Sequence, residues 1–78
     1  MAFYTYDDEA EALYILLVPD EDPAIAETVE LTDRLHVDLD ERGRPVGVEI
    51  LDPDNGIDLG PVKERFGLEL KLPFPFAA

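Results

Sequence analysis

Large apolar residues occupy every second position along two neighbouring segments in the middle of the chain, residues 35–40 and 46–51. A period of two is typical of half-buried β-strands. Residues 41–44 separate the segments and include Gly43, which adopts a left-handed turn conformation without steric cost. The pattern therefore predicts a β-hairpin with an even-length loop or a compensating bulge. The two apolar rows share a face if Leu35 pairs with Ile50, Val37 with Val48 and Leu39 with Val46.

Three more strands are expected before this hairpin. Residues 3–6 are rich in aromatic side chains that suit a pleated surface. Residues 12–18 are apolar at every position, so this strand is expected to be central and covered on both faces. After the proline-containing break at 19–23, residues 25–31 predict a third strand with Val29 and Leu31 pointing inward. Together the segments predict a mainly β fold, a single antiparallel meander of about five strands in which each strand lies beside its sequence neighbour.

A short helix is expected near the C-terminus, over residues 60–67. Pro61 suits a first helical position and Gly67 a helix end. Val62 and Phe66 are four residues apart, so they share one side of the helix and are expected to pack on the sheet.

The last residues form an apolar arm in which leucine and phenylalanine alternate with Pro73 and Pro75. The prolines remove backbone donors along one side, so the arm is expected to pair along one edge only. An exposed stripe of this size is unfavourable in water, so the arm is expected to close over its own sheet or to contact a second copy. We favour a homodimer, with Leu72, Phe74 and Phe76 as interaction residues, supported by Tyr4, Tyr6 and Tyr14.

Charge narrows the range of partners. Nineteen acidic residues face six basic ones, for a formal charge of −13. Such a surface repels nucleic acids and anionic membranes and attracts basic proteins, although the acidity also suits solubility or a high-salt environment. No segment is long and apolar enough to span a membrane, and the N-terminus lacks a signal-peptide pattern, so a cytoplasmic protein is expected.

Few residues are suited to catalysis. The chain has no cysteine or serine, and His36, its one histidine, is expected on the polar face of its strand beside Asp38 and Glu49. Acidic pairs on that face are expected from chance alone when acids are so frequent. We therefore expect no enzymatic activity, no catalytic residues and no cofactor. The one weak candidate for a divalent metal is the loop bearing Asp52, Asp54 and Asp58.

Two blocks resemble the DUF2283 family. Residues 6–15, YDDEAEALYI, are similar to its YD-x-x-x-D-ALYI block, and residues 37–51, VDLDERGRPVGVEIL, to its V-D-x-D-x-x-G-x-[IV]-VG-[IF]-EIL block. Glu11 replaces an aspartate, and Pro45 replaces a β-branched residue. The resemblance covers about residues 4–52. The length of 78 residues predicts one domain, 1–78, with a family-like sheet core over 1–54 and the helix and arm over 55–78. The function of the family is unknown, and some members lie beside small toxin-like proteins.

These observations predict a non-enzymatic protein-interaction module. Its expected form is an antitoxin-like acidic partner of a small basic protein, which docks through charge complementarity and apolar contact. The alternative is a self-associating structural homodimer with no external partner. A weak metal-binding protein is a third hypothesis.

Overall fold

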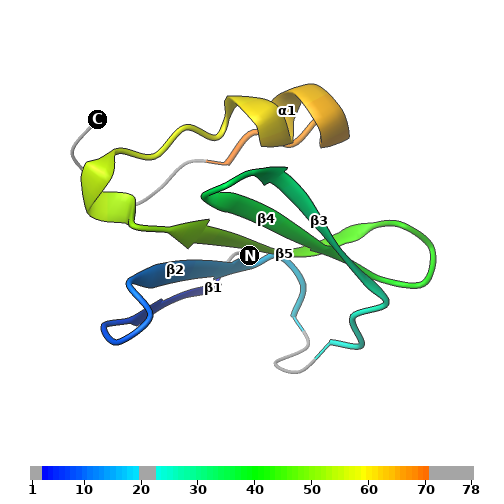
Figure 1. The fold of residues 1–78 in the computed structure, drawn as a ribbon. Helices are drawn as coiled ribbons and strands as arrows, with labels where there is room; N and C mark the ends of the chain where they lie inside the picture. Colours follow the sequence, from blue (N-terminus) through cyan, green and yellow to red (C-terminus); the bar gives the residue numbers. More distant parts are fainter. Residues whose placement is uncertain (1–2, 20–22, 71–78) are drawn as a thin grey trace.

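The computed structural model describes residues 3–19 and 23–70, which form a five-stranded antiparallel sheet with one α-helix (Figure 1). This confirms the predicted mainly β fold with a short C-terminal helix. A 3₁₀ turn, η1 (Pro53–Asn55), and the helix α1 (Gly60–Phe66) follow the last strand. The strands are β1 (Phe3–Asp7), β2 (Ala12–Leu16), β3 (Glu27–Thr32), β4 (Leu35–Leu39) and β5 (Pro45–Leu51).

The strand order is β1–β2–β5–β4–β3, so the predicted meander order is wrong. Strand β5 lies between β2 and β4, and β3 lies at the far edge of the sheet. Strand β2 has a partner on each side in both arrangements, so the difference lies in β3, which the predicted meander would place between β2 and β4. Strand β3 exposes every second residue and suits an edge. Strands β2 and β3 are consecutive in the sequence, but β5 and β4 separate them in the sheet (Figure 1).

Most of the residue pairs predicted for the central hairpin are observed. Leu35 pairs with Ile50 and Val37 with Val48, as expected. Leu39 pairs with Pro45, however, so its predicted pairing with Val46 is wrong. The turn closes through the amide of Asp40, which donates to the Arg44 carbonyl at 2.9 Å, and it contains Gly43 at φ 76°. This odd-length turn leaves Val46 as an extra residue, the compensating bulge that keeps the remaining pairs in register.

The hydrophobic core lies between α1 and one face of the sheet (Figure 1). Val62 of α1 is completely buried, and Phe66 packs against the same cluster, as predicted. The helix ends at Gly67, which has a left-handed φ of 70° and donates its amide to the Lys63 carbonyl at 2.8 Å. The sheet contributes Leu13, Ile15, Leu35, Val37, Leu39, Val48 and Ile50 to this core.

The opposite side of the sheet, which we call the open face, is not covered by α1 (Figure 1). Tyr14 and Leu16 of β2 are only half-buried there, so the complete cover expected on both sides of β2 is not observed within residues 3–19 and 23–70. The predicted arm, with Leu72, Phe74 and Phe76, lies outside the described residues. By strand register, the open face carries Thr5, Asp7, Ala12, Tyr14, Leu16, Thr28, Glu30, His36, Asp38, Gly47, Glu49 and Leu51.

Candidate functional site

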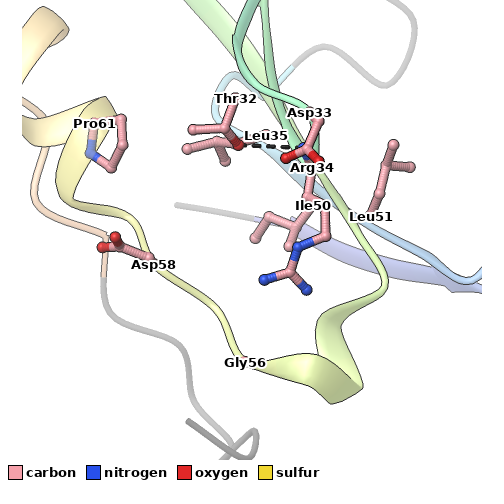
Figure 2. A pocket seen from close by; sticks show the side chains of 9 residues that line it. All are labelled: Thr32, Asp33, Arg34, Leu35, Ile50, Leu51, Gly56, Asp58 and Pro61. Atoms are coloured by element: carbon pink, nitrogen blue, oxygen red, sulfur yellow. Dashed lines mark hydrogen bonds between the residues drawn. The ribbon is translucent and has the colours of Figure 1, made fainter.

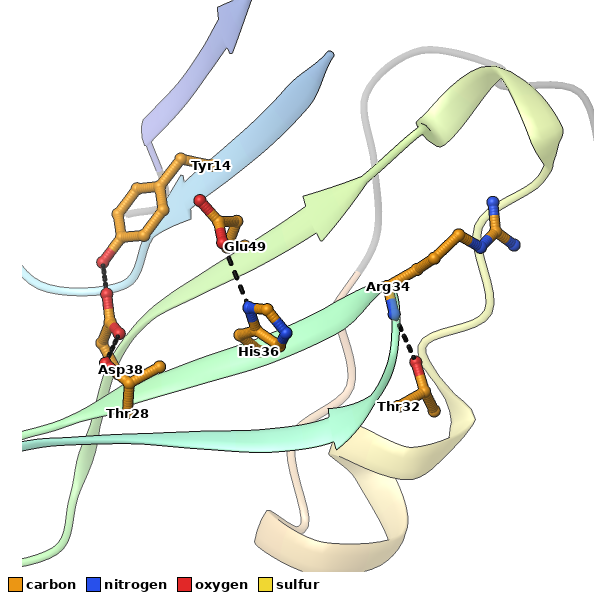
Figure 3. Close-up of polar contacts among 7 residues, drawn as sticks. All are labelled: Tyr14, Thr28, Thr32, Arg34, His36, Asp38 and Glu49. Atoms are coloured by element: carbon orange, nitrogen blue, oxygen red, sulfur yellow. Dashed lines mark hydrogen bonds and ion pairs between the residues drawn. The ribbon is translucent and has the colours of Figure 1, made fainter. Parts of the chain in front are cut away.

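A hydrogen-bonded network crosses the open face through Asp38 of β4 (Figure 3). The Tyr14 hydroxyl, from β2, donates to Asp38 Oδ2 at 2.7 Å. The Thr28 hydroxyl, from β3, donates to Asp38 Oδ1 at 2.6 Å. Both donors are neutral, so the carboxylate is held in place by two hydrogen bonds while its negative charge is not compensated.

Gly47 makes the hydrogen bond between Tyr14 and Asp38 possible. Tyr14 reaches Asp38 from β2 across β5, and its phenol occupies the space above Gly47. A Cβ at position 47 would overlap the Tyr14 hydroxyl and Cζ. A glycine within a strand commonly marks such a close approach, and this signal was available in the sequence. The predictions included Tyr14 but neither Gly47 nor Thr28.

The environment of Tyr14 keeps its hydroxyl protonated. Burial raises the pKa of Tyr14, and the hydrogen bond to the Asp38 carboxylate raises the pKa further. The phenol therefore stays a hydrogen-bond donor throughout the physiological pH range. It acts as a fixed structural group on this face, and not as a proton acceptor.

His36 and Glu49 form a second polar contact beside this network (Figure 3). They are direct partners in the register of β4 and β5, and His36 Nδ1 lies 3.2 Å from Glu49 Oε1. The position of His36 on the polar face is as predicted. The side chain of Glu49 is 40% exposed, so its carboxylate remains accessible to a partner from outside the sheet.

Within residues 3–19 and 23–70, the strands that form the open face contribute no permanent positive charge to it. None of the five strands contains a lysine or an arginine, whereas Asp7, Glu30, Asp38 and Glu49 lie on this face. Basic side chains lie in other parts of the described chain: Arg34 donates to the Asp52 carbonyl, Arg44 pairs with Asp40, and Lys63 pairs with Glu69. The face therefore combines half-buried apolar side chains with uncompensated acids.

The predicted interaction tyrosines do not form one surface. Tyr4 and Tyr6 pair with Ile15 and Leu13, so they lie on the helix-covered side of the sheet, whereas Tyr14 lies on the open face. Tyr4 is half-buried and packs against the core. Tyr6 is 46% exposed at the edge strand β1. Of the three, Tyr14 alone contributes to the open face.

The predicted metal candidates are not gathered into a site. The described chain contains no group of three acidic, histidine or cysteine residues placed to hold a metal ion, and this includes Asp52, Asp54 and Asp58. Asp52 accepts a hydrogen bond from the Asn55 side chain at 2.6 Å, and Asp58 accepts one from the Gly60 amide at 3.0 Å. The carboxylates of Asp52 and Asp58 therefore accept hydrogen bonds within the turn and at the start of α1.

A pocket of about 240 Å³ lies between the β3–β4 turn and the segment that leads to α1 (Figure 2). The guanidinium of Arg34 points into it and donates from Nη1 to the Asp52 carbonyl at 2.9 Å. Its other charged lining residues are Asp33 and Asp58. Thr32 also lines the pocket, and its hydroxyl accepts a hydrogen bond from the Arg34 amide at 3.2 Å.

A family model for proteins of unknown function, DUF2283, matches residues 4–52. This span is more than half of the chain. The chain belongs to the DUF2283 family. The DUF2283 match covers the sheet from β1 to β5 and ends before α1, so it includes Tyr14, Thr28, Asp38 and Gly47. No curated protein and no solved structure matches the chain. None of the helices in the described chain is long and apolar enough to cross a membrane.

Proposed function

We propose that this protein is a non-enzymatic interaction module, an antitoxin-like partner whose open face binds a small basic protein. The observation that carries the proposal is the absence of lysine and arginine from all five strands, together with four acids on the open face. Half-buried Tyr14, Leu16 and Leu51 lie on the same face and provide apolar contact area. A cationic surface with apolar residues complements both properties.

The alternative, a homodimer without an external partner, predicts a different dependence of association on salt. Two copies joined through their open faces would bring Glu30, Asp38 and Glu49 of each copy together without a compensating lysine or arginine from the strands. Like charges across an interface oppose association, and salt reduces that repulsion. A complex with a basic partner therefore weakens as salt rises, whereas self-association through this face strengthens. The sign of the salt dependence separates the two functions.

Affinity capture from lysate of the source cell tests the proposal with two baits of equal charge. Glu30→Lys/Glu49→Lys reverses two charges on the open face, whereas Glu9→Lys/Glu64→Lys reverses two exposed charges away from it. We expect the unmodified bait and the second variant to retain a near-stoichiometric basic protein at low salt and to release it at high salt. The open-face variant should not retain it. Recovery of the bait alone, or equal retention by both variants, would refute the proposal; circular dichroism verifies that both variants fold.

A further inference from the structure

The ring of Tyr14 is held in a fixed position on the open face. Its hydroxyl is anchored to Asp38 at 2.7 Å, and Gly47 allows the phenol to lie against the backbone of β5. The side chain is nevertheless only half-buried, so part of the ring remains in contact with solvent. A rigid and partly exposed aromatic side chain is a suitable surface for stacking, because little side-chain entropy is lost when a partner binds.

Negative charge surrounds this ring. Glu49 is the direct cross-strand partner of Tyr14, which places their side chains next to each other on the same face. Asp38 lies at the hydroxyl end of the ring, and both of its oxygens accept hydrogen bonds from neutral hydroxyls. Glu49 contacts His36 through Oε1, and its side chain is 40% exposed. The ring therefore lies between two carboxylates that no lysine or arginine of the strands compensates.

We propose that this part of the open face receives an arginine side chain of the basic partner, which stacks on the Tyr14 ring and pairs with the Glu49 carboxylate. A cation within about 6 Å of an aromatic centroid is attracted by the ring. Arginine suits this geometry better than lysine, because its guanidinium is planar, weakly hydrated and able to stack while it donates hydrogen bonds to a carboxylate. This inference rests on the proposed function and specifies the chemistry of the partner.

The test uses the full ¹⁵N-labelled chain, an unstructured hexa-arginine peptide and a hexa-lysine peptide of equal charge. NMR titration at low salt gives both the affinity and the amides that shift. We expect the arginine peptide to shift the amides of Tyr14, Gly47 and Glu49, and to bind about two- to five-fold more tightly than the lysine peptide. Tyr14→Leu should remove this preference while the weaker, charge-driven binding of both peptides persists. Tyr14→Phe keeps the ring and should keep the preference.

The outcomes separate this inference from the proposed function. Equal affinities for the two peptides, with shifts on the open face, would refute the arginine site and leave the docking of a basic partner standing. Retention of the full preference in Tyr14→Leu would also refute stacking, because no ring would remain at this position. Shifts confined to the acidic turns at residues 8–11 and 52–58 would refute both the arginine site and the open face as a docking surface. The dispersion of each spectrum shows directly whether the variant is folded.

Discussion

The phenol of Tyr14 lies where a side chain at position 47 would be. A Cβ added to Gly47 would lie 2.9 Å from Tyr14 Cε2 and still nearer to the hydroxyl end of the ring. Gly47 has no positive φ, so its backbone conformation is open to any residue, and the requirement for glycine comes from the ring alone. The small residue on β5 is thus what allows Tyr14 on β2 to bind Asp38 on β4.

Replacement of Gly47 by alanine is therefore expected to destabilise the protein. The added methyl group must displace the Tyr14 ring and break its hydrogen bond to Asp38, at a cost of about 1–3 kcal/mol in the free energy of unfolding. Urea denaturation measures this cost. In a Tyr14→Ala background the same substitution meets no ring, so its cost should largely disappear. Equal costs in the two backgrounds would contradict the proposed contact.

Removal of the Tyr14 hydroxyl should also reduce stability. Tyr14→Phe deletes a 2.7 Å hydrogen bond to a carboxylate in a half-buried setting, and we expect a loss of about 1 kcal/mol. The control is Tyr6→Phe at the exposed edge, which should change the free energy of unfolding by less than about 0.5 kcal/mol. Equal effects of the two substitutions would show that the network does not contribute to stability.

The packing of α1 and its C-terminal end can be tested by substitutions at two positions, which act through different physical causes. Val62→Ala removes buried methyl groups from the core and leaves a cavity, which should cost about 2 kcal/mol. Gly67→Ala adds a methyl group with no atom within 4 Å, so its cost of about 1 kcal/mol comes from the left-handed φ of 70° alone. Because asparagine tolerates this conformation, Gly67→Asn should cost less than Gly67→Ala in thermal or urea unfolding. The reverse order would argue against the left-handed helix end.

Asp40 gives the central hairpin a defined pH dependence. The backbone amides of Arg44 and Arg42 donate to its carboxylate, and these hydrogen bonds lower the pKa of Asp40 below its ordinary value of 3.8. A lowered folded-state pKa stabilises the fold above the unfolded value, and this contribution is lost as pH falls through the folded pKa. Asp40→Asn should therefore reduce stability near neutral pH, and its difference from the unmodified protein should disappear in strong acid. Urea denaturation near neutral pH and in strong acid measures the difference in the free energy of unfolding between the two proteins. A difference that does not change with pH would contradict the proposed role of the Asp40 carboxylate.

The sequence predicted the elements of this fold better than their arrangement. Alternation at residues 35–40 and 46–51 identified β4 and β5, and Pro61 and Gly67 marked the limits of α1 correctly. Alternation assigns residues to a face of the sheet, but it does not say which strands are neighbours. The insertion of β5 beside β2 depends on long-range pairing, so it had no local signal. The bulge at Val46 depends on the turn geometry around Gly43, which set an odd loop length.

The open face was predictable only in part. The polar residues at alternate positions of β4 correctly predicted that His36 and Asp38 share a face. The network itself joins Tyr14, Asp38 and Thr28 from three strands, and its geometry depends on a strand order that was predicted incorrectly. The tyrosines were grouped by residue type, whereas the register divides them between two faces. Apolar character alone therefore identified candidate contact residues but not the surface to which each belongs.

Sedimentation velocity of the purified protein at low and high salt tests most directly whether the open face is free for a basic partner. With four acids on that face and no lysine or arginine on its strands, we predict that the open face is not a dimer interface at low salt: Leu16→Lys should leave the oligomeric state unchanged, and any self-association through this face should increase with salt. The contradictory result is a complete dimer at low salt that Leu16→Lys, a substitution on the open face, converts to monomer. That result would show that a second copy occupies this surface, and the self-associating homodimer would replace the interaction module as the function of the fold.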